Sequence, residues 1–316
     1  MYRNCYISTV NSIAMKIVLF VGLMMGGGML SCQRLDSLVT DSVTGKKVMA
    51  YQFKDKWLLY PKPKFFNFLT QAPRTFQHSA IESFSKKSVP AWVAIAWSTS
   101  VLAMRDQAML ESVQQFSRFI KLDNSRIYHD VLDFKIGKQE VTIYEAPGNL
   151  NTFFYQIGEG LPPLLLGAGL AIYGHVNHDY RARSTANQLV QTFVVMGIGT
   201  QVMKRMFGRE SPFVATADGG AWRPFPNLKT YQNSVSKYDA MPSGHMATLM
   251  ATVVVLSGNY PEKRWIKPVG YSVMSLVGLA MMNNGVHWAG DYPLAIGLGY
   301  VVGNVTVKMN RWVRGK

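Results

Sequence analysis

The step Pro242-Ser243-Gly244-His245 places a hydroxyl, two backbone N–H groups and an imidazole next to one another. An apolar run follows it, so the sequence predicts a helix that begins here with Ser243 as its N-cap. The N-terminus of a helix carries partial positive charge and free N–H groups, which suit a phosphate-sized anion. Ser243 and the N–H group of Gly244 are therefore candidate ligands of phosphoryl oxygens. Taken alone, the same step fits an ordinary helix cap.

Two histidines, an acid and a lysine complete a candidate catalytic set. His287 and Asp291 are four residues apart and would share one face of a helix. We expect Asp291 to hold one nitrogen of His287 and leave the other as a nucleophile. His245 is the candidate general acid and base, since an imidazole titrates near neutral pH. Lys204 would add a point charge for phosphate, although a lysine that simply extends to the surface from a helix end is commoner.

These residues lie in three blocks, Lys204 to Pro212, Pro242 to His245 and Ala280 to Asp291. The order and the gaps of the blocks resemble the signature of the superfamily of type 2 phosphatidic acid phosphatases (PAP2) and vanadium haloperoxidases. The resemblance extends from about residue 150 to residue 308. It implies an all-α, multi-helix bundle and a phosphatase that needs no metal and no other cofactor.

The resemblance also implies a role for each matched residue. His287 would form a phosphohistidine, His245 would protonate the leaving group and activate water, and Asp291 would orient His287. The phosphate would be bound by Lys204, Ser243 and Gly244.

Two positions depart from the family pattern. Ser211 and Met281 stand where the family has arginines that clamp the phosphoryl oxygens, a task for which a guanidinium fork is suited. We expect Arg209 and Arg223 to supply the missing charge, and Asn283 and Asn284 are possible neutral donors. If neither arginine reaches the site, the protein would be a slow enzyme or a phosphate binder without turnover.

The composition favours anionic partners at a membrane. Of 316 residues, 48% are hydrophobic and 16% are charged, and the net charge is +15. A low charged fraction indicates a membrane or a large buried core, and a basic balance attracts acidic lipid head groups or phosphorylated substrates. We do not expect nucleic acid as a partner, because the basic residues are spread along the chain without a nucleic-acid-binding motif.

The first 32 residues resemble a bacterial lipoprotein signal. A positive charge at Lys16, a short apolar run and small residues precede Cys32. We expect Cys32 to be lipidated and Met15 to be the true start, with an ordinary cleaved signal or an uncleaved anchor as alternatives. The chain contains two cysteines, so it shows no disulfide framework.

Residues 33–88 are expected to form a basic, irregular extension that prolines break into short pieces. Residues 89–316 are expected to form the PAP2-like helical domain. Apolar patterning predicts an apolar helix at 89–104 that continues through Arg105 and Asp106 into the amphipathic stretch 107–120. It predicts further helices at 152–175, 186–206, 244–258, 267–285 and 290–309. His175, His178 and Asp179 lie between two of them and are interpreted as loop residues rather than as a metal site.

The predicted helices leave two membrane arrangements open. If they span a bilayer, three basic loops would face the cytoplasm and the candidate site would face the periplasm. Several helices are shorter than the roughly 20 apolar residues that a span requires. The alternative is a periplasmic body that Cys32 anchors by lipid to the inner membrane.

The sequence therefore predicts a phosphatase of the cell envelope that acts on phosphomonoesters or pyrophosphates of membrane lipids. The implied substrate class includes phosphatidic acid, phosphatidylglycerol phosphate, polyprenyl pyrophosphate and lipid A, and the sequence does not choose among them. A catalytically weak envelope lipoprotein that binds phosphate or lipid head groups is the main alternative. A vanadate-dependent haloperoxidase is a remote one.

Overall fold

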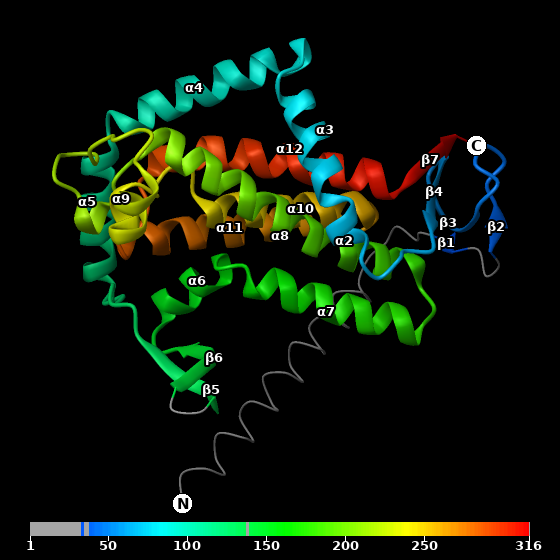
Figure 1. Cartoon of the computed structure of the whole chain (residues 1–316), viewed down its shortest axis with the longest axis horizontal. Coiled ribbons are helices and arrows are strands. Elements are labelled where there is room, and N and C mark those ends of the chain that lie inside the picture. The colour runs from blue at the N-terminus through cyan, green and yellow to red at the C-terminus, as the bar shows by residue number, and fades with distance from the viewer. Residues whose placement is uncertain (1–32, 35–37, 137–138, 316) are drawn as a thin grey trace, which may run out of the picture.

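The computed structural model describes residues 33–34, 38–136 and 139–315. Most of this part is helical, which confirms the predicted all-α class. Its α-helices are α2 (Asn67–Thr70), α3 (Ala72–Ser83), α4 (Val89–Ala103), α5 (Asp106–Phe119), α6 (Leu150–Gly158), α7 (Leu161–Val176), α8 (Tyr180–Phe207), α9 (Leu228–Asn233), α10 (Gly244–Asn259), α11 (Ile266–Asn283) and α12 (Tyr292–Asn310). The centre of the molecule is a bundle of α8, α10, α11 and α12, with α7 along one side (Figure 1).

Local sequence signals set the ends of the bundle helices. The side chain of Asp179 accepts a hydrogen bond from the N–H of Ala182 and begins α8, and Ser243 caps α10 in the same way. Gly208 ends α8 with φ 57°, a left-handed conformation that glycine adopts without strain. A Cβ at Gly208 would clash with the carbonyl of Arg223, so close backbone packing also requires glycine here.

The core of the bundle lies where α10 meets α8, α11 and α12. Ala247, Ala251, Val277 and Ala295 are fully buried there. The small side chains of α10 face glycines of α12, and a Cβ at Gly299 would clash with the backbone of Ala247. These small residues let the two helix backbones approach closely, which fixes the position of the start of α10.

The predicted helix 152–175 is two helices, α6 and α7, which meet at a bend of 64°. The bend lies at Glu159 and Gly160, and Gly160 has φ 93°. A Cβ at Gly160 would clash with the ring of Phe193, so the chain turns here against α8. By length and composition, no single helix of the described part could cross a membrane, whereas this bent pair could.

The extension before the helical domain is more ordered than we expected. An antiparallel sheet with the strand order β1-β3-β4-β7 occupies one end of the molecule, and β2 also pairs with β3. Its strands are β1 (Gln33–Arg34), β2 (Val39–Thr40), β3 (Lys47–Phe53), β4 (Lys56–Pro61) and β7 (Trp312–Gly315). The expectation of an irregular segment was wrong for residues 47–61, because valine, tyrosine and leucine on these strands are buried against the bundle and against each other.

Hydrogen bonds join this sheet to the ends of two helices. The hydroxyl of Tyr51 donates to Asp179 before α8 over 2.8 Å, and the hydroxyl of Tyr60 donates to Asn259, the last residue of α10, over 3.1 Å. The helices α8 and α10 thus have one end at the sheet. Lys204 and His245 lie at their other ends.

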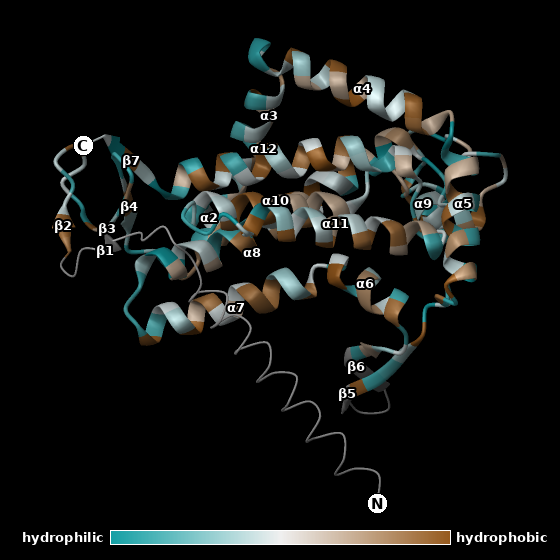
Figure 2. Ribbon diagram, turned by 180° about the vertical axis from the view of Figure 1, so that it is seen from behind, coloured by the Kyte–Doolittle hydropathy of each residue, from teal (hydrophilic) through white to brown (hydrophobic). Residues whose placement is uncertain are grey.

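Two further elements lie outside the bundle. The strands β5 (Tyr128–Ile136) and β6 (Gln139–Pro147) form a hairpin between α5 and α6. Helix α4 contacts the bundle at α12, has no buried residue and carries apolar residues along its length (Figure 2). The predicted lipoprotein segment 1–32, with Cys32, lies outside the described residues.

Candidate active site

The structure brings the two predicted catalytic histidines together. His245 is the second residue of α10 and His287 lies in the turn after α11. Their ring centroids are 5.8 Å apart, and the ring planes meet at 73°. Nε2 of His245 and Nδ1 of His287 are both buried without a hydrogen-bond partner among the described residues. Buried polar atoms without partners are uncommon in proteins and are typical of a site that receives a ligand.

Asp291 lies behind His287, as the spacing predicted. Its Oδ2 is 3.5 Å from Nδ1 of His287, at the outer limit of hydrogen bonding, and accepts a hydrogen bond from the N–H of Trp288 over 2.8 Å. The carboxylate is fully buried. It lies in a short 3₁₀ turn, Ala289–Asp291, rather than in the α-helix that we expected. The Nδ1 atom of His287 faces the acid, and Nε2 is the other ring nitrogen.

Lys204 lies in the last turn of α8 and is buried. Its Nζ is 3.4 Å from Oδ2 of Asp239. Burial holds the pKa of His245 well below its usual value, and the charges of His287 and then of Lys204 act in the same direction. The charge of Lys204 therefore acts on His245, so Lys204 lies near the histidine pair.

Ser243 is the N-cap of α10, which confirms the structural part of its predicted role. Its Oγ accepts a hydrogen bond from the N–H of Met246 over 3.4 Å and lies 3.8 Å from Sδ of Met281. The N–H groups of Gly244 and His245 have no acceptor among the described residues. The first turn of α10 thus presents two free donors beside the histidine pair.

Arg209 has a different environment from the one that we predicted. Its guanidinium is buried, with Nη2 2.6 Å from Asp106 at the start of α5 and Nη1 2.7 Å from Oδ1 of Asp291. Nε and Nη2 also donate to the carbonyl of Gly219. These contacts speak against Arg209 as a phosphate ligand. They assign it instead to holding Asp291, the acid that faces His287.

Arg223 is also engaged elsewhere. It forms an ion pair with the buried carboxylate of Glu210 and donates to Oγ1 of Thr216 over 3.0 Å. Burial alone would raise the pKa of Glu210, but hydrogen bonds from the N–H of Thr216, from Arg223 and from the N–H of Ala221 hold it at about 2. Arg223 therefore neutralises a permanent carboxylate, and its contacts do not support the predicted role at the phosphate.

The two positions that lack the family arginines are buried. Met281 is fully buried beside Ser243, and the N–H of Ser211 donates to the carbonyl of Ser236 over 2.9 Å. Asn283 donates to Oδ1 of Asn151 over 3.0 Å, and Asn151 donates to Asn284. The asparagines therefore join α11 to α6, and these contacts do not support a role as phosphate donors.

Sequence reasoning missed several residues around the histidine pair. Tyr155 of α6 packs against His245 with ring centroids 5.0 Å apart. Asp239 pairs with Lys204, and Asp106 pairs with Arg209. No motif marks these residues, because they come from elements whose packing is set only in the folded chain.

No group of three or more His, Cys, Asp or Glu side chains among the described residues could hold a metal ion. His175 ends α7 and His178 lies in the turn before α8, at the sheet end of the bundle. Nδ1 of His175 lies 3.0 Å from the carbonyl of Ala171 within its own helix, and this carbonyl can only accept a hydrogen bond.

Comparison with known proteins agrees with the three sequence blocks. Residues 185–314 match the family model described as the PAP2 superfamily. The matched residues make up less than half of the 316-residue chain. The matched PAP2 region contains Lys204, His245, His287 and Asp291, the residues that the structure gathers.

Two known PAP2 proteins are similar to the chain. A lipid A 1-phosphatase of Porphyromonas gingivalis is 25% identical over 166 residues, which are 51% of this chain and 32% of the relative. The chain therefore matches about a third of that relative's length. A transmembrane PAP2 type phosphatidylglycerolphosphate phosphatase from Bacillus subtilis is 14% identical in sequence, with a TM-score of 0.33 over 77% of this chain and 94% of the other.

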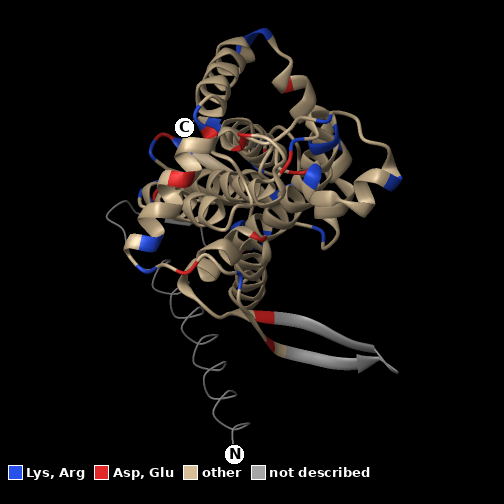
Figure 3. Cartoon of the chain, turned by 90° about the vertical axis from the view of Figure 1, so that its left-hand side faces the viewer, with Lys and Arg blue, Asp and Glu red and all other residues tan. Residues whose placement is uncertain are grey.

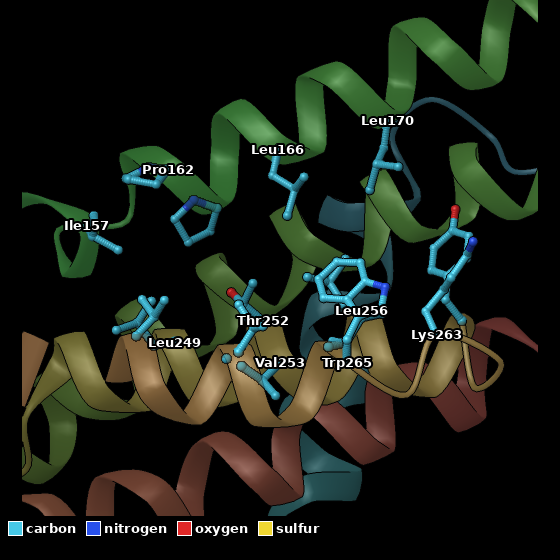
Figure 4. Close-up of a pocket in the computed structure, with 16 residues that line it drawn as sticks. Ile157, Pro162, Leu166, Leu170, Leu249, Thr252, Val253, Leu256, Lys263 and Trp265 are labelled. Atoms are coloured by element: carbon cyan, nitrogen blue, oxygen red, sulfur yellow. The ribbon is translucent and has the colours of Figure 1, made fainter. Parts of the chain in front are cut away.

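An apolar pocket of about 330 Å³ lies between α7 on one side and α10 and α11 on the other (Figure 4). At one end it is lined by Ile157 of α6 and Leu249 of α10, and Leu249 is one helical turn from His245. At the other end it reaches Lys263 and Trp265 (Figure 4). The pocket thus starts near the histidine pair and follows α10 away from it.

Proposed function

We propose that this protein is a phosphatase that hydrolyses phosphate esters of membrane lipids through a phosphohistidine. The observation that carries the proposal is the pairing of His245 with His287, 5.8 Å apart, with Asp291 behind His287. A nucleophile, a proton donor and an orienting acid around one anion site are the groups that this reaction requires.

In the first half of the reaction, Nε2 of His287 attacks the phosphorus atom. A nitrogen–phosphorus bond forms, the bond to the ester oxygen breaks, and the departing alkoxide takes a proton from His245. In the second half, His245 accepts a proton from water as the water oxygen attacks phosphorus. Inorganic phosphate leaves and His287 is restored. Asp291 stabilises the positive charge on the ring of His287, and Lys204 with the first N–H groups of α10 binds the phosphoryl oxygens.

The lowered pKa of His245 fits this cycle. In the free protein His245 is neutral at pH 7, because burial lowers its pKa and the electrostatic influence of His287 and Lys204 acts in the same direction. A phosphate dianion in the site adds negative charge and raises this pKa. Substrate binding would therefore protonate His245, and product release would return it to the neutral form.

The apolar pocket favours a lipid over a soluble ester. It is lined by aliphatic side chains such as Ile157, Leu166 and Leu249, and it begins one turn from His245 (Figure 4). An acyl chain in this pocket would leave its phosphorylated end at the start of α10. The name of the relative in Porphyromonas gingivalis, a lipid A 1-phosphatase, points to the same substrate class.

The proposed location is the outer face of the inner membrane of a bacterium. A net charge of +15 favours contact with anionic lipid. Lipidation of Cys32 stays a prediction and would add an anchor.

The test is phosphate release from vesicles that contain phosphatidic acid, phosphatidylglycerol phosphate, a polyprenyl pyrophosphate or lipid A, beside a soluble phosphomonoester. We expect turnover of at least one lipid and a loss of about a thousandfold or more in kcat for His287→Ala. His178→Ala, a histidine at the opposite end of the bundle, is the control and should keep full activity. Equal phosphate release by the wild type and His287→Ala would refute the mechanism.

A second function is favoured by one observation. Ser211 and Met281 provide no guanidinium, and the protein could therefore bind phosphorylated head groups without turnover. In that case the wild type would release no phosphate from any substrate, while Lys204→Ala would still weaken the binding of inorganic phosphate.

A further inference from the structure

The site as described lacks an arginine. A phosphoryl group in transfer carries charge on three oxygens, and an arginine fork can bind two of them at once. Arg209 is paired with Asp106 and Asp291, and Arg223 is paired with Glu210. The cation that replaces the family arginines must therefore come from another element.

Arg126 lies in the segment between α5 and β5, upstream of the PAP2-matched region. Its guanidinium carbon lies 5.4 Å from the ring centroid of Phe213. Phe213 is two residues beyond Ser211, and its N–H donates to the carbonyl of Gly285 over 2.9 Å. Gly285 is two residues before His287. Arg126 thus lies over the contact between the first and third sequence blocks.

A second contact brings Arg126 toward the other histidine. Burial and the charge of Glu159 raise the pKa of the Tyr155 hydroxyl, whereas Arg126 opposes them through its charge and a side-chain hydrogen bond. The ring of Tyr155 packs on His245 with centroids 5.0 Å apart. Arg126 thus contacts Phe213 and interacts with Tyr155, the residue that packs on His245.

The backbone on both sides of Arg126 is held in place. The carbonyl of Ser125 accepts hydrogen bonds from Asn149 over 2.8 Å and from Thr152 over 3.2 Å. The N–H of Ile127 donates to Oγ1 of Thr152 over 3.3 Å. These bonds fix the segment to the N-terminus of α6, the helix that carries Tyr155.

The side chain of Arg126 remains exposed. Within the described ranges, no carboxylate lies within ion-pairing distance of it, in contrast to Arg209 and Arg223. An anchored backbone with an exposed guanidinium that forms no ion pair within the described ranges is the arrangement expected of a residue that binds a mobile anion.

We propose that Arg126 is the phosphate-binding arginine of this protein and replaces the guanidiniums that the family holds at positions 211 and 281. This inference rests on the proposed function for its substrate, and it assigns a residue outside the matched region to the site. Arg126 would reach the phosphoryl group past Tyr155 once the anion lies at the start of α10.

Three variants test the proposal: Arg126→Ala, Arg126→Lys and the control Arg118→Ala. Arg118 is an exposed arginine in the last turn of α5, and its loss changes the net charge equally. We expect Arg126→Ala to lower kcat/KM on a lipid phosphate by about a hundredfold to a thousandfold. Arg126→Lys should recover only part of this loss, because an ammonium cannot bind two oxygens in a fork. Arg118→Ala should stay within about twofold of the wild type.

Affinity for orthovanadate and for inorganic phosphate provides a readout that does not depend on turnover. We expect Arg126→Ala to weaken both, with an unchanged melting temperature. If the wild type binds phosphate in an Arg126-dependent way but releases none from any substrate, the phosphatase proposal fails and the role of Arg126 stands. If Arg126→Ala keeps both kcat/KM and phosphate affinity within about twofold of the wild type, Arg126 is not a ligand, whatever the activity of the protein.

Discussion

At the scale of single residues, the site depends on a histidine that is neutral in the resting protein. His245 is flanked by His287 and by Lys204, and burial adds to their effect in keeping its pKa low. A neutral imidazole can accept a proton at once but can donate one only after an anion has bound. The state of His245 therefore reports whether the site is occupied.

The stability of the protein should depend on pH because the pKa of His245 is lowered in the folded chain. The pKa of His245 is lower in the folded chain than the usual value of about 6.5, so the unfolded chain binds more protons below that pH. The contribution of His245 to stability is complete above pH 6.5 and is lost as the pH falls toward its folded-state pKa. We expect the melting temperature of the wild type to drop more between pH 7 and pH 5 than that of His245→Gln.

Inorganic phosphate should reduce this difference, because its negative charge raises the pKa of His245 and opposes the charge of Lys204. The melting temperature should be measured by calorimetry with and without phosphate. Identical pH profiles for the wild type and His245→Gln would show that His245 does not titrate as described.

The sequence predicted which residues form the site more accurately than it predicted their hydrogen-bond and ion-pair partners. The resemblance of the three blocks to the family signature placed His245 and His287 in one site, and the four-residue spacing paired His287 with Asp291. The role of Arg209 could not be predicted in the same way. Its choice of Asp106 over phosphate depends on where α5 packs, and no local pattern encodes that contact. Arg126 was missed for the same reason.

At the scale of elements, the position of the histidine pair depends on how closely α10 and α12 pack. Gly299 faces the backbone of Ala247, two residues beyond His245. A side chain at 299 would push the start of α10 away from α12. It would also move α10 relative to Asp291, which lies directly before α12.

We expect Gly299→Ala to destabilise the protein by about 1–3 kcal/mol, since the added methyl group has no space. The matched control is Gly197→Ala in α8. Gly197 is exposed, and a Cβ there meets nothing within 4 Å. Alanine at 197 should stabilise the helix by about 0.4–1 kcal/mol through its lower backbone entropy in the unfolded chain. Denaturant unfolding of both variants measures the difference, and equal stabilities would contradict the packing described here.

The helices α10, α11 and α12 were predicted close to their observed bounds, because their apolar runs are long and Ser243 is a clear cap. For α8 the predicted end is close to the observed one at Gly208, but the helix begins at Tyr180 rather than at 186, because Asp179 acts as its N-cap. The break between α6 and α7 was missed, since the apolar pattern continues through Gly160 and only its contact with Phe193 requires the bend. The strands β3 and β4 were missed because β4 pairs on one side with β7, from the other end of the chain. Such long-range pairing leaves little trace in a local pattern.

At the scale of the whole molecule, α4 exposes large apolar side chains to solvent. Val93 and Trp97 are 63% and 69% exposed, and α4 has no buried residue. Lys86 and Lys87 precede the helix and Arg105 follows it. Basic residues also lie on several sides of the molecule (Figure 3). An apolar helix with basic ends suits the surface of an anionic membrane.

We expect Val93→Glu and Trp97→Glu together to weaken binding to vesicles of anionic lipid by about tenfold or more, because each removes a large apolar side chain from the lipid. Val43→Glu, at an exposed valine near the sheet, is the control for charge and should have a smaller effect. Cosedimentation measures the binding. Release of the wild type by high salt alone would show that charge, rather than insertion of α4, holds the protein to the membrane.

The ion pair between Arg209 and Asp106 also limits where the chain could be cut to give a fragment that folds. The recognisable family sequence starts at residue 185, yet the carboxylate that completes the charge balance of Arg209 lies in α5, at residue 106. A fragment that begins where the family match begins would lack Asp106. The buried guanidinium of Arg209 would then keep only one of its two carboxylate partners, which would lower the free energy of unfolding by about 3–5 kcal/mol. The smallest autonomous unit of this protein is therefore larger than the part that sequence similarity outlines. Asp291, through Arg209, is held in place by a segment outside that part.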